Sequence, residues 1–359
     1  MLLPDFGEQA QARLKKGRVL IIGAGGLGSP ASLYLAAAGV GTIGLVDYDT
    51  VDETNLQRQI LYGTSDVGRR KLDVAHARLC DINPLVTIER VDEPFNPANA
   101  RRLVEAFDVV VDGSDNFPTR YLVNDACVIT HTPNVYGSVS RFEGQASVFA
   151  APGGPCYRCL HPEPPPAGLI PSCAEGGVLG VLPGLIGTIQ ATEAIKILAG
   201  VGEPLVGRLL LYDALGMRTR QIVLPRDPEC PICSDRPTIR EIAAYEPVCA
   251  PASGREDEMT IEELRAWRRE GRAHALIDVR EPAEHRDARI EGAELIPLGT
   301  VREAIGRLPT DRPIVVHCRS GARSARAVAV LREAGLEAYN LAGGMQAWLR
   351  AGAETTEPG

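Results

Sequence analysis

The chain has 359 residues, of which 45% are hydrophobic and 23% are charged, and its net charge at pH 7 is −8. This length exceeds one ordinary hydrophobic core and predicts two domains, whereas an acidic balance without a basic stripe gives no reason to expect nucleic-acid binding. No apolar run precedes a small-residue cleavage site near the first residue, so no secretory signal is predicted. We therefore expect a cytoplasmic protein whose nine cysteines stay reduced and serve metal binding or catalysis.

Short apolar runs alternate with amphipathic stretches from residue 18 to about residue 150. The runs RVLIIG, TIGLVDYD, VTIERV and DVVVDGSD are typical of buried strands, with helices between them. This βαβ succession predicts an α/β fold with a doubly wound, mostly parallel, Rossmann-like sheet. Residues 152–177 are rich in Pro, Gly and Cys and predict loops, a helix is expected at about 184–198, and GRLLLYDAL and TRQIVL predict a closing hairpin.

The longest apolar stretch covers residues 178–199. It is interrupted by Pro183, Gln190, Glu193 and Lys196, and these interruptions favour a buried helix over a membrane span. No membrane association is expected.

The composition changes at CAPASGREDE, residues 249–258, where small, charged, Pro and Gly residues predict a linker. A helix (TIEELRAWRREG) and two strands (HALIDVR and IVVHC) follow from Met259. We expect a first domain at 1–245, a linker at 246–258 and a smaller α/β domain at 259–355.

A glycine-rich turn, GAGGLG, follows the first strand and opens a helix. Its glycines Gly23, Gly25, Gly26 and Gly28 permit a tight turn and close backbone approach, and the helix N-terminus attracts phosphate. Asp47 ends the next strand, where an acidic residue would hold a ribose hydroxyl. On these residues alone, an NAD-dependent enzyme is the straightforward interpretation.

The next polar residues favour a triphosphate over NAD. Asn55 and Arg58 follow the ribose position, Lys71 comes after them, and Asp115–Asn116 follow a buried strand. Two cations and a strand-end carboxylate suit ATP with Mg²⁺, because charge neutralisation governs attack at phosphorus. The alternative is that Arg58 and Lys71 are solvated surface charges.

The motifs GAGGLGSP, NLQRQ, SDNFPTRYLVNDAC, RFEGQ and GPCYRCLHP occur in order. Over about residues 2–245 the chain resembles the MoeB/ThiF family, relatives of ubiquitin-activating enzymes. The family adenylates the C-terminal Gly-Gly carboxylate of a small ubiquitin-fold carrier protein, and it forms homodimers. The resemblance implies that Asp115 is the most critical catalytic residue, with Arg58 beside it. It also implies the residues that bind ATP and Mg²⁺: Gly26, Asp47, Asn55, Arg58, Lys71, Asp115 and Asn116.

Two C-x-x-C pairs, Cys156 with Cys159 and Cys230 with Cys233, lie in Gly/Pro turns. Four thiolates in two such pairs suit tetrahedral zinc, with Zn–S distances of about 2.3 Å. Four protein ligands leave no open position, so the zinc is predicted to be structural. The alternative is a set of redox dithiols or unrelated thiols.

Cys173 lies in IPSCAEGGVLG, just before the apolar helix. The sequence alone favours an ordinary loop thiol, whereas the family resemblance implies a cysteine that links to the carrier or relays sulfur. It therefore stands as a catalytic candidate. Cys80 and Cys127 lie in apolar helical patterns and are expected to be core residues.

A loop at the end of a late strand places a cysteine at the start of a helix. The backbone N–H groups of such a loop and the helix N-terminus favour the thiolate, which can carry a persulfide. A cysteine phosphatase is the competing interpretation, but its loop is one residue longer. The candidate persulfide loop comprises Cys318, Arg319, Ser320, Gly321, Ala322 and Arg323.

The segments LIDVREPAEHRDARIEGAELIPL, VVHCRSGARSARAV and NLAGGMQAW resemble a rhodanese domain over about residues 259–352. The resemblance implies that Cys318 carries the persulfide and that residues 319–323 cradle it. It also implies structural roles for Asp278 and Arg280. The whole chain is similar to the MoeB–rhodanese fusions, which are MoeZ-like sulfurtransferases.

Together these resemblances predict a bifunctional adenylyltransferase and sulfurtransferase. ATP would activate a carrier's terminal glycine, and the Cys318 persulfide, loaded by a donor such as a cysteine desulfurase, would convert it to a thiocarboxylate. Such carriers serve molybdopterin, thiamine, cysteine or tRNA-thiolation pathways. One alternative is a ubiquitin-like conjugation activator with Cys173 as its thioester site. The other is an oxidoreductase with an unrelated thiol domain.

Overall fold

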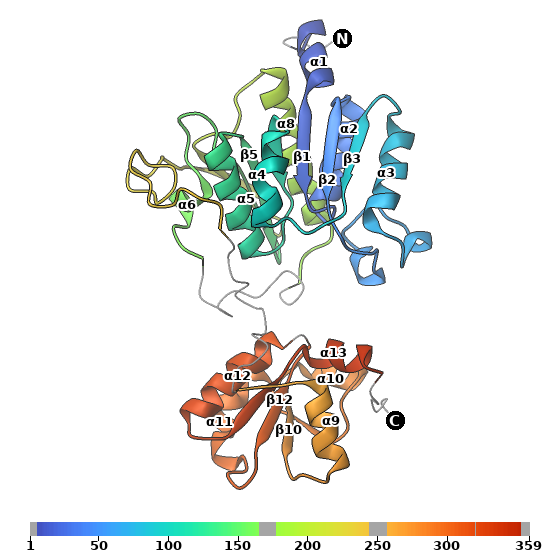
Figure 1. The fold of residues 1–359 in the computed structure, drawn as a ribbon, viewed down its shortest axis with the longest axis vertical. Helices are drawn as coiled ribbons and strands as arrows, with labels where there is room; N and C mark the ends of the chain where they lie inside the picture. Colours follow the sequence, from blue (N-terminus) through green and yellow to red (C-terminus); the bar gives the residue numbers. More distant parts are fainter. Residues whose placement is uncertain (1–5, 165–176, 244–256, 320, 353–359) are drawn as a thin grey trace. The chain divides into compact units, whose positions relative to one another are not determined.

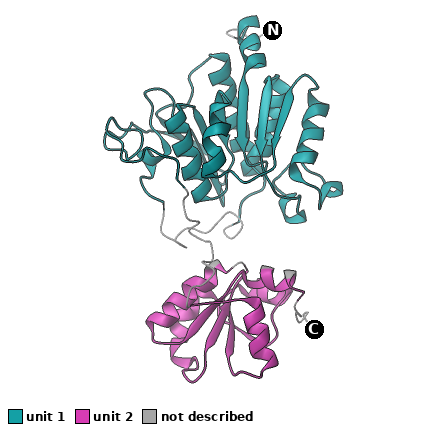
Figure 2. Ribbon diagram, viewed as in Figure 1, with its two compact units in different colours: residues 1–165, 170–247 teal, residues 166–169, 248–359 magenta. Residues whose placement is uncertain are grey.

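The computed structural model describes residues 6–164, 177–243, 257–319 and 321–352 of the chain. These residues form two compact units, each with its own sheet and core (Figure 2). Unit 1 contains the described residues up to 243, and unit 2 contains those from 257 onward. Cys173 lies outside the described residues, and so do residues 246–256 of the linker expected at 246–258.

Unit 1 is built on one eight-stranded sheet in the order β3-β2-β1-β4-β5-β6-β7-β8 (Figure 1). The strands from β3 to β5 are parallel, and β6, β7 and β8 continue as an antiparallel meander. The strands are β1 Arg18–Ile22, β2 Thr42–Val46, β3 Thr87–Val91, β4 Val109–Asp112, β5 Asn134–Ser140, β6 Glu143–Phe149, β7 Arg208–Asp213 and β8 Arg218–Val223. The predicted doubly wound sheet and its closing β7–β8 hairpin are confirmed.

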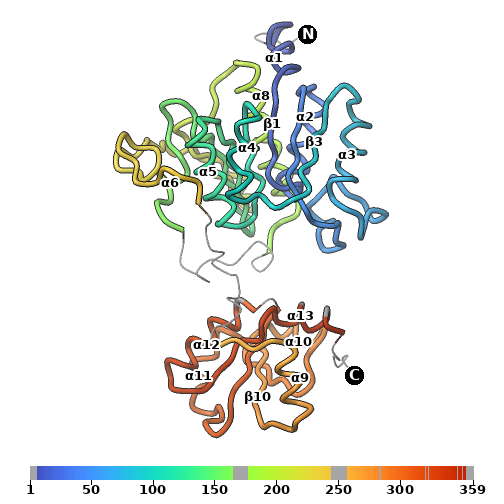
Figure 3. The backbone as a smooth tube through the Cα atoms, viewed as in Figure 1, coloured from blue at the N-terminus to red at the C-terminus, as the bar shows by residue number. Residues whose placement is uncertain are grey.

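Helices cover both faces of the parallel strands, which explains why these strands are apolar throughout. Val19 of β1 packs into a core with residues of α1, α2, α3 and α8, whereas its neighbour Leu20 packs into a second core with α4 and α5. The helices are α1 Glu8–Lys16, α2 Gly28–Ala38, α3 Lys71–Ile82, α4 Pro97–Glu105, α5 Phe117–Thr130, α6 Tyr157–Leu160 and α8 Val181–Ala199, with 3-10 turns η1 Glu53–Asn55 and η2 Thr64–Asp66. In Figure 3, α3 and α6 lie at opposite sides of unit 1.

Helix α8 is the one described helix that is long and apolar enough to cross a membrane by length and composition. It packs against α2 and β5, and its polar residues Gln190 and Glu193 are buried inside unit 1. It therefore has the environment of a core helix, as the interrupted apolar pattern predicts.

Unit 2 has a parallel five-stranded sheet in the order β11-β10-β12-β13-β9. The strands are β9 Glu258–Met259, β10 Ala275–Asp278, β11 Ala293–Leu295, β12 Ile314–His317 and β13 Ala338–Leu341. The helices are α9 Ile261–Arg269, α10 Pro282–Asp287, α11 Val301–Ala304, α12 Ala322–Glu333 and α13 Gly344–Arg350, with 3-10 turns η3 Leu298–Thr300 and η4 Ile305–Arg307. Strand β12 is buried along its whole length and leads into the cysteine loop, so the thiol sits at the carboxyl end of a central strand.

Candidate functional site

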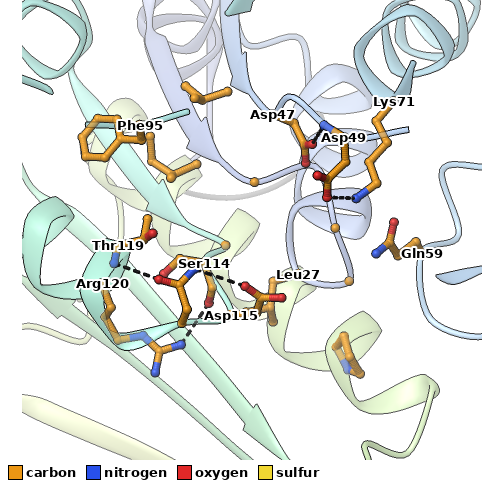
Figure 4. Close-up of a pocket in the computed structure, with 18 of the residues that line it drawn as sticks. Leu27, Asp47, Asp49, Gln59, Lys71, Phe95, Ser114, Asp115, Thr119 and Arg120 are labelled. Carbon is orange, nitrogen blue, oxygen red and sulfur yellow. Dashed lines mark hydrogen bonds and ion pairs between the residues drawn. The ribbon is translucent and has the colours of Figure 1, made fainter. Parts of the chain in front are cut away.

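A pocket of about 210 Å³ opens at the carboxyl ends of β1, β2 and β4 in unit 1 (Figure 4). The lining includes most of the nucleotide-binding residues expected from the sequence, namely Gly23, Gly25, Gly26, Asp47, Arg58, Lys71, Asp115 and Asn116. Two expected residues do not line it. Gly28 is buried where an added Cβ would clash with the Gly23 carbonyl oxygen, and Asn55 ends η1.

The glycine-rich turn is held to the end of β2 by Asp47. One carboxylate oxygen of Asp47 accepts a hydrogen bond from the Ala24 N–H at 2.9 Å, and the other accepts from the Asp49 N–H at 2.9 Å. The Tyr62 hydroxyl donates to the Ala24 carbonyl at 2.8 Å, and this hydrogen bond also holds the turn in place. Gly23 has a φ of +88°, a conformation that side chains rarely adopt, so a glycine is required there.

Lys71 is buried at the start of α3, and its ammonium contacts the carboxylate of the more exposed Asp49 at 2.9 Å. A buried ammonium needs such a partner, and together the two groups place a fixed charge pair at one side of the pocket (Figure 4). Arg58 is half-buried, and its guanidinium donates to the Thr54 carbonyl at 3.0 Å. Asp49 is a pocket residue that the sequence reasoning missed, although it stands in the strand-end motif DYD.

Asp115 lies across the pocket from Lys71 (Figure 4). It is followed by Asn116, which also lines the pocket. Asn116 caps α5 by accepting the Thr119 N–H at 2.9 Å. The Asp115 carboxylate is exposed and receives only a long contact of 3.4 Å from the Asn116 amide. It is therefore accessible to a cation bound in the pocket, and carboxylate oxygen is a ligand that Mg²⁺ prefers.

Gln59 and Arg120 are further buried polar residues that line the pocket and that were not predicted. The Gln59 Oε1 atom has no hydrogen-bond partner in the described part of the chain. Each lies inside a motif already noted, Gln59 in NLQRQ and Arg120 in SDNFPTR. The sequence signal that could have identified both residues was a polar side chain within a segment that packs into the protein.

The four cysteines of the two C-x-x-C pairs come together, with all Sγ atoms within 4.8 Å of one another. The Sγ–Sγ distances are 3.5 Å for Cys156 and Cys230, 3.4 Å for Cys159 and Cys233, and 4.0 Å for Cys156 and Cys159. A zinc tetrahedron with Zn–S bonds of about 2.3 Å has edges of roughly 3.8 Å. The donor set and its spacing therefore fit zinc, and the cysteine cluster offers a closed set of four ligands.

The first pair of cysteines is anchored to α5. The Tyr157 N–H donates to the Asn124 side-chain oxygen at 2.7 Å, and the Arg158 guanidinium grips the Asp125 carboxylate at 2.8 and 3.0 Å. Arg158 and Asp125 are both buried, so each charge depends on the other.

In unit 2, Cys318 follows β12 and is buried. Its Sγ accepts the Gly321 N–H at 3.1 Å and the Ser324 hydroxyl at 3.4 Å. Gly321 has a φ of +101° and is the residue from which α12 begins. These two donors favour negative charge on the sulfur, which is the form that accepts and transfers sulfur.

The two arginines of this loop differ in their exposure and in their partners. Arg319 is exposed, whereas the Arg323 guanidinium makes two hydrogen bonds of 2.7 Å to the Glu284 carboxylate of α10. The hydrogen bonds from Arg323 are the main reason that the pKa of Glu284 lies below its usual value. Ser320 lies outside the described residues, and Ala322 is the first residue of α12.

A buried polar cluster lies beneath the loop. Asp278 accepts from Arg280 at 2.6 to 3.0 Å and contacts His285 at 2.8 Å. Burial raises the pKa of Asp278, but Arg280, His317 and His285 together outweigh burial, so its pKa lies below the usual value. Burial also lowers the pKa of His317 to about 4, so this histidine next to Cys318 is neutral at pH 7.

The sequence of residues 1–232 matches the model of the ThiF family, and residues 260–351 match the model of the rhodanese-like domain. The chain belongs to the ThiF family. The pocket and three of the four clustered cysteines lie within the ThiF match, Cys233 follows it directly, and Cys318 lies within the rhodanese-like match.

Two curated relatives match nearly the whole length of this chain, and a third matches part of it. A probable adenylyltransferase/sulfurtransferase MoeZ of Mycobacterium tuberculosis is 49% identical, covering 98% of this chain and 91% of the relative. An adenylyltransferase and sulfurtransferase MOCS3 of Sus scrofa is 42% identical, covering 97% and 84%. A sulfur carrier protein adenylyltransferase of Thermus thermophilus is 52% identical, and the match covers 69% of this chain and 94% of the relative.

Solved structures support the ThiF fold of unit 1. Escherichia coli MccB, crystallised with AMPCPP and MccA, superposes with a TM-score of 0.58 at 23% identity and covers 63% of this chain and 69% of that one. At this identity the likeness concerns the fold alone.

Proposed function

We propose that this protein adenylates the C-terminal glycine of a small ubiquitin-fold sulfur carrier and then converts it to a thiocarboxylate. The observation that carries the proposal is the presence, in one chain, of a ThiF nucleotide pocket and a rhodanese-like cysteine loop. The names of the relatives agree, since they include both adenylyltransferase and sulfurtransferase activities and a sulfur carrier.

In the first step, the carrier's carboxylate oxygen attacks the α-phosphorus of ATP, and pyrophosphate leaves. Lys71 and Arg58 lie where they would neutralise phosphate charge, and the glycine-rich turn leaves room for close approach of the phosphates. Asp47 already holds the turn, and it would receive the ribose hydroxyls at its position beside the pocket. The step matters because a carboxylate accepts a nucleophile only once AMP is its leaving group.

We assign a Mg²⁺ ligand role to Asp115, whose exposed carboxylate faces the pocket. A magnesium ion held by Asp115 would supply positive charge that offsets the negative charge on the leaving pyrophosphate. Zinc held by the four cysteines has no open position and would supply structural stability only.

In the second step, the terminal sulfur of a Cys318 persulfide attacks the acyl carbon, and AMP leaves. A thiol then attacks the Cys318 sulfur of the resulting acyl disulfide, which releases the thiocarboxylate and leaves a disulfide on Cys318. Cys173, which lies outside the described residues, is our candidate for this thiol. The Gly321 N–H and the Ser324 hydroxyl would hold the inner sulfur of the Cys318 persulfide in position for both attacks.

We further propose a cytoplasmic homodimer that receives its persulfide sulfur from an upstream donor such as a cysteine desulfurase. We propose domain limits of 1–245 for adenylation and 259–355 for sulfur transfer, with residues 246–258 as the connection between them.

The test is intact-mass spectrometry of a Gly-Gly-ended carrier after incubation with the protein, ATP, Mg²⁺ and a persulfide donor. We expect the carrier to exchange one oxygen for one sulfur, and this change to vanish with Cys318→Ala. A carrier that stops at the adenylate with the unaltered protein, or becomes joined to Cys173 as its final product, would refute the sulfur-transfer step and favour a conjugation activator.

A further inference from the structure

Arg120 is a buried guanidinium at the edge of the nucleotide pocket, on α5. One Nη atom donates to the Ser114 carbonyl at 3.0 Å, and the other donates to the Ser138 hydroxyl at 3.2 Å. Its Nε atom has no hydrogen-bond partner among the described residues, so the group is held through its two Nη atoms. Arg120 therefore ties the turn after β4 to strand β5.

The residue that Arg120 holds immediately precedes Asp115. Ser114 is fixed from a second direction as well, because its N–H and its hydroxyl both donate to the same Asp112 oxygen, at 3.0 and 2.5 Å. Asp112 is itself fully buried at the end of β4. Every hydrogen-bonding group of Ser114 is thus engaged, and the backbone entering Asp115 has little freedom to move.

The other neighbours of Arg120 belong to the cysteine cluster and to the aromatic core beside it. Tyr157 stands between Cys156 and Cys159 in the C-x-x-C pair, and its side chain interacts with the Arg120 guanidinium. The guanidinium also lies over the Tyr136 ring at 5.2 Å, and the Tyr136 and Tyr157 rings are 5.4 Å apart. A cation between aromatic rings has a defined position, since it is attracted to their faces.

We propose that Tyr157 and Arg120 are positioning residues that link the four-cysteine cluster to the magnesium-binding carboxylate. Tyr157 sets the position of Arg120, and Arg120 sets the position of Asp115 through the Ser114 carbonyl. This inference rests on the proposed function, because it assigns Asp115 to Mg²⁺ in the adenylation step. In this arrangement the geometry of the magnesium site, and not only the stability of unit 1, depends on the cysteine cluster.

Two variants separate this role from a general loss of packing. Tyr157→Phe keeps the ring and removes only the hydroxyl, while Arg120→Lys keeps the charge but cannot make both Nη hydrogen bonds. Tyr121→Phe is the matched control, because it removes a hydroxyl from the same aromatic core whose hydrogen bonds go to the His161 and Glu163 carbonyls instead. Each full-length variant is titrated with ATP by calorimetry at several Mg²⁺ concentrations, and its zinc content is measured.

We expect both variants to retain zinc, and Tyr157→Phe, whose residue lies outside the pocket lining, to bind ATP without Mg²⁺ as the unaltered protein does. The Mg²⁺ concentration for half-maximal enhancement of ATP binding should rise about 10-fold to 100-fold in Arg120→Lys, as for lost outer-shell partners of other metal sites, and several-fold in Tyr157→Phe. Tyr121→Phe should not change it.

An unchanged Mg²⁺ requirement in Arg120→Lys and Tyr157→Phe would overturn the link, as would an equal rise in Tyr121→Phe. Should Tyr157→Phe lose zinc, Arg120→Lys still decides the matter, since Arg120 lies outside the cysteine pairs. If the unaltered protein bound no ATP with Mg²⁺, the proposed adenylation would fail instead, so the two failures are distinguishable.

Discussion

The two cysteine sites of this chain use the same side chain in opposite surroundings. In unit 1, Cys156 meets Cys230 across 74 residues of sequence, and every sulfur lies next to the other three, although the Cys159 sulfur also accepts two backbone N–H groups at 3.4 Å. In unit 2, the sulfur of Cys318 is surrounded by local donors, the Gly321 N–H and the Ser324 hydroxyl. The comparison teaches that the neighbours decide the role: clustered thiolates need a metal to offset their repulsion, whereas a single thiolate among donors is available as a nucleophile.

The largest effect is expected from Cys318→Ala. We expect sulfur transfer to the carrier to fall at least about 1,000-fold, since no other described thiol lies in unit 2 and the nucleophile is lost. Adenylation, followed as carrier-dependent ATP–pyrophosphate exchange, should stay within about twofold because its residues lie in unit 1. Residual sulfur transfer near the unaltered rate would show that Cys318 is not the carrier of sulfur.

Cys230→Ser should lower the stability of unit 1 rather than abolish one step of the reaction. Zinc contributes about 10–16 kcal/mol in zinc-finger peptides, but unit 1 has a large core of its own, so we expect a loss of about 3–5 kcal/mol. At roughly 2–4 °C per kcal/mol, the Tm of unit 1 should fall by about 10 °C.

This change can be assigned to one unit. Both tryptophans of the chain, Trp267 and Trp348, lie in unit 2, so tryptophan fluorescence follows unit 2 while circular dichroism also follows unit 1. Metal analysis should show zinc absent in Cys230→Ser and present in the control Cys80→Ser, whose sulfur lies outside the cluster. A zinc-free variant that melted like the unaltered protein would contradict a structural role.

Gly344→Ala should destabilise unit 2 by displacing the backbone of the Cys318 loop. Gly344 has a φ of +53°, and an added Cβ would clash with the Cys318 carbonyl oxygen. We expect unit 2 to lose about 2–4 kcal/mol, from the strained backbone and the clash together, measured by tryptophan fluorescence during unfolding. Gly335→Ala is the control, because Gly335 has a φ of +83° but open space around it, so only the strain of about 1–2 kcal/mol applies. Equal losses in the two variants would show that the contact beneath Cys318 is unimportant.

The need for a glycine at position 344 illustrates what the sequence does not disclose. Short apolar runs were sufficient to predict the parallel strands β1 to β4, β10 and β12, and the β7–β8 hairpin. Strands β5 and β6 were not predicted, since NVYGSVS and EGQASVF carry the small and polar residues of a sheet that passes beneath α8. There Gly137 and Gly144 lie so close to α8 that a side chain would clash with Gln190 and Ile186.

The same limit applies to the sites. The glycine-rich turn, the cysteine pairs and the Cys318 loop are contiguous motifs, so they could be found in sequence. Asp49 and Arg120 could not be assigned, because their roles depend on Lys71 and Ser114, which the fold brings to them from other elements. Contacts of that kind follow from tertiary packing, and no local pattern encodes them.

The smallest predicted effect is that of Ser324→Ala. The Ser324 hydroxyl is 3.4 Å from the Cys318 sulfur and also donates toward the Gly321 carbonyl at 3.1 Å, so only part of its hydrogen bonding stabilises the thiolate. We expect alkylation of Cys318 by iodoacetamide at pH 7 to slow about 3-fold to 10-fold, as for the loss of one donor to a charged group. Alkylation of Cys80 in the same sample is the internal control and should not change. A rate unaltered by the substitution would leave the Gly321 N–H as the donor that matters, and the comparison between clustered and donor-held thiols would then rest on the backbone of the loop alone.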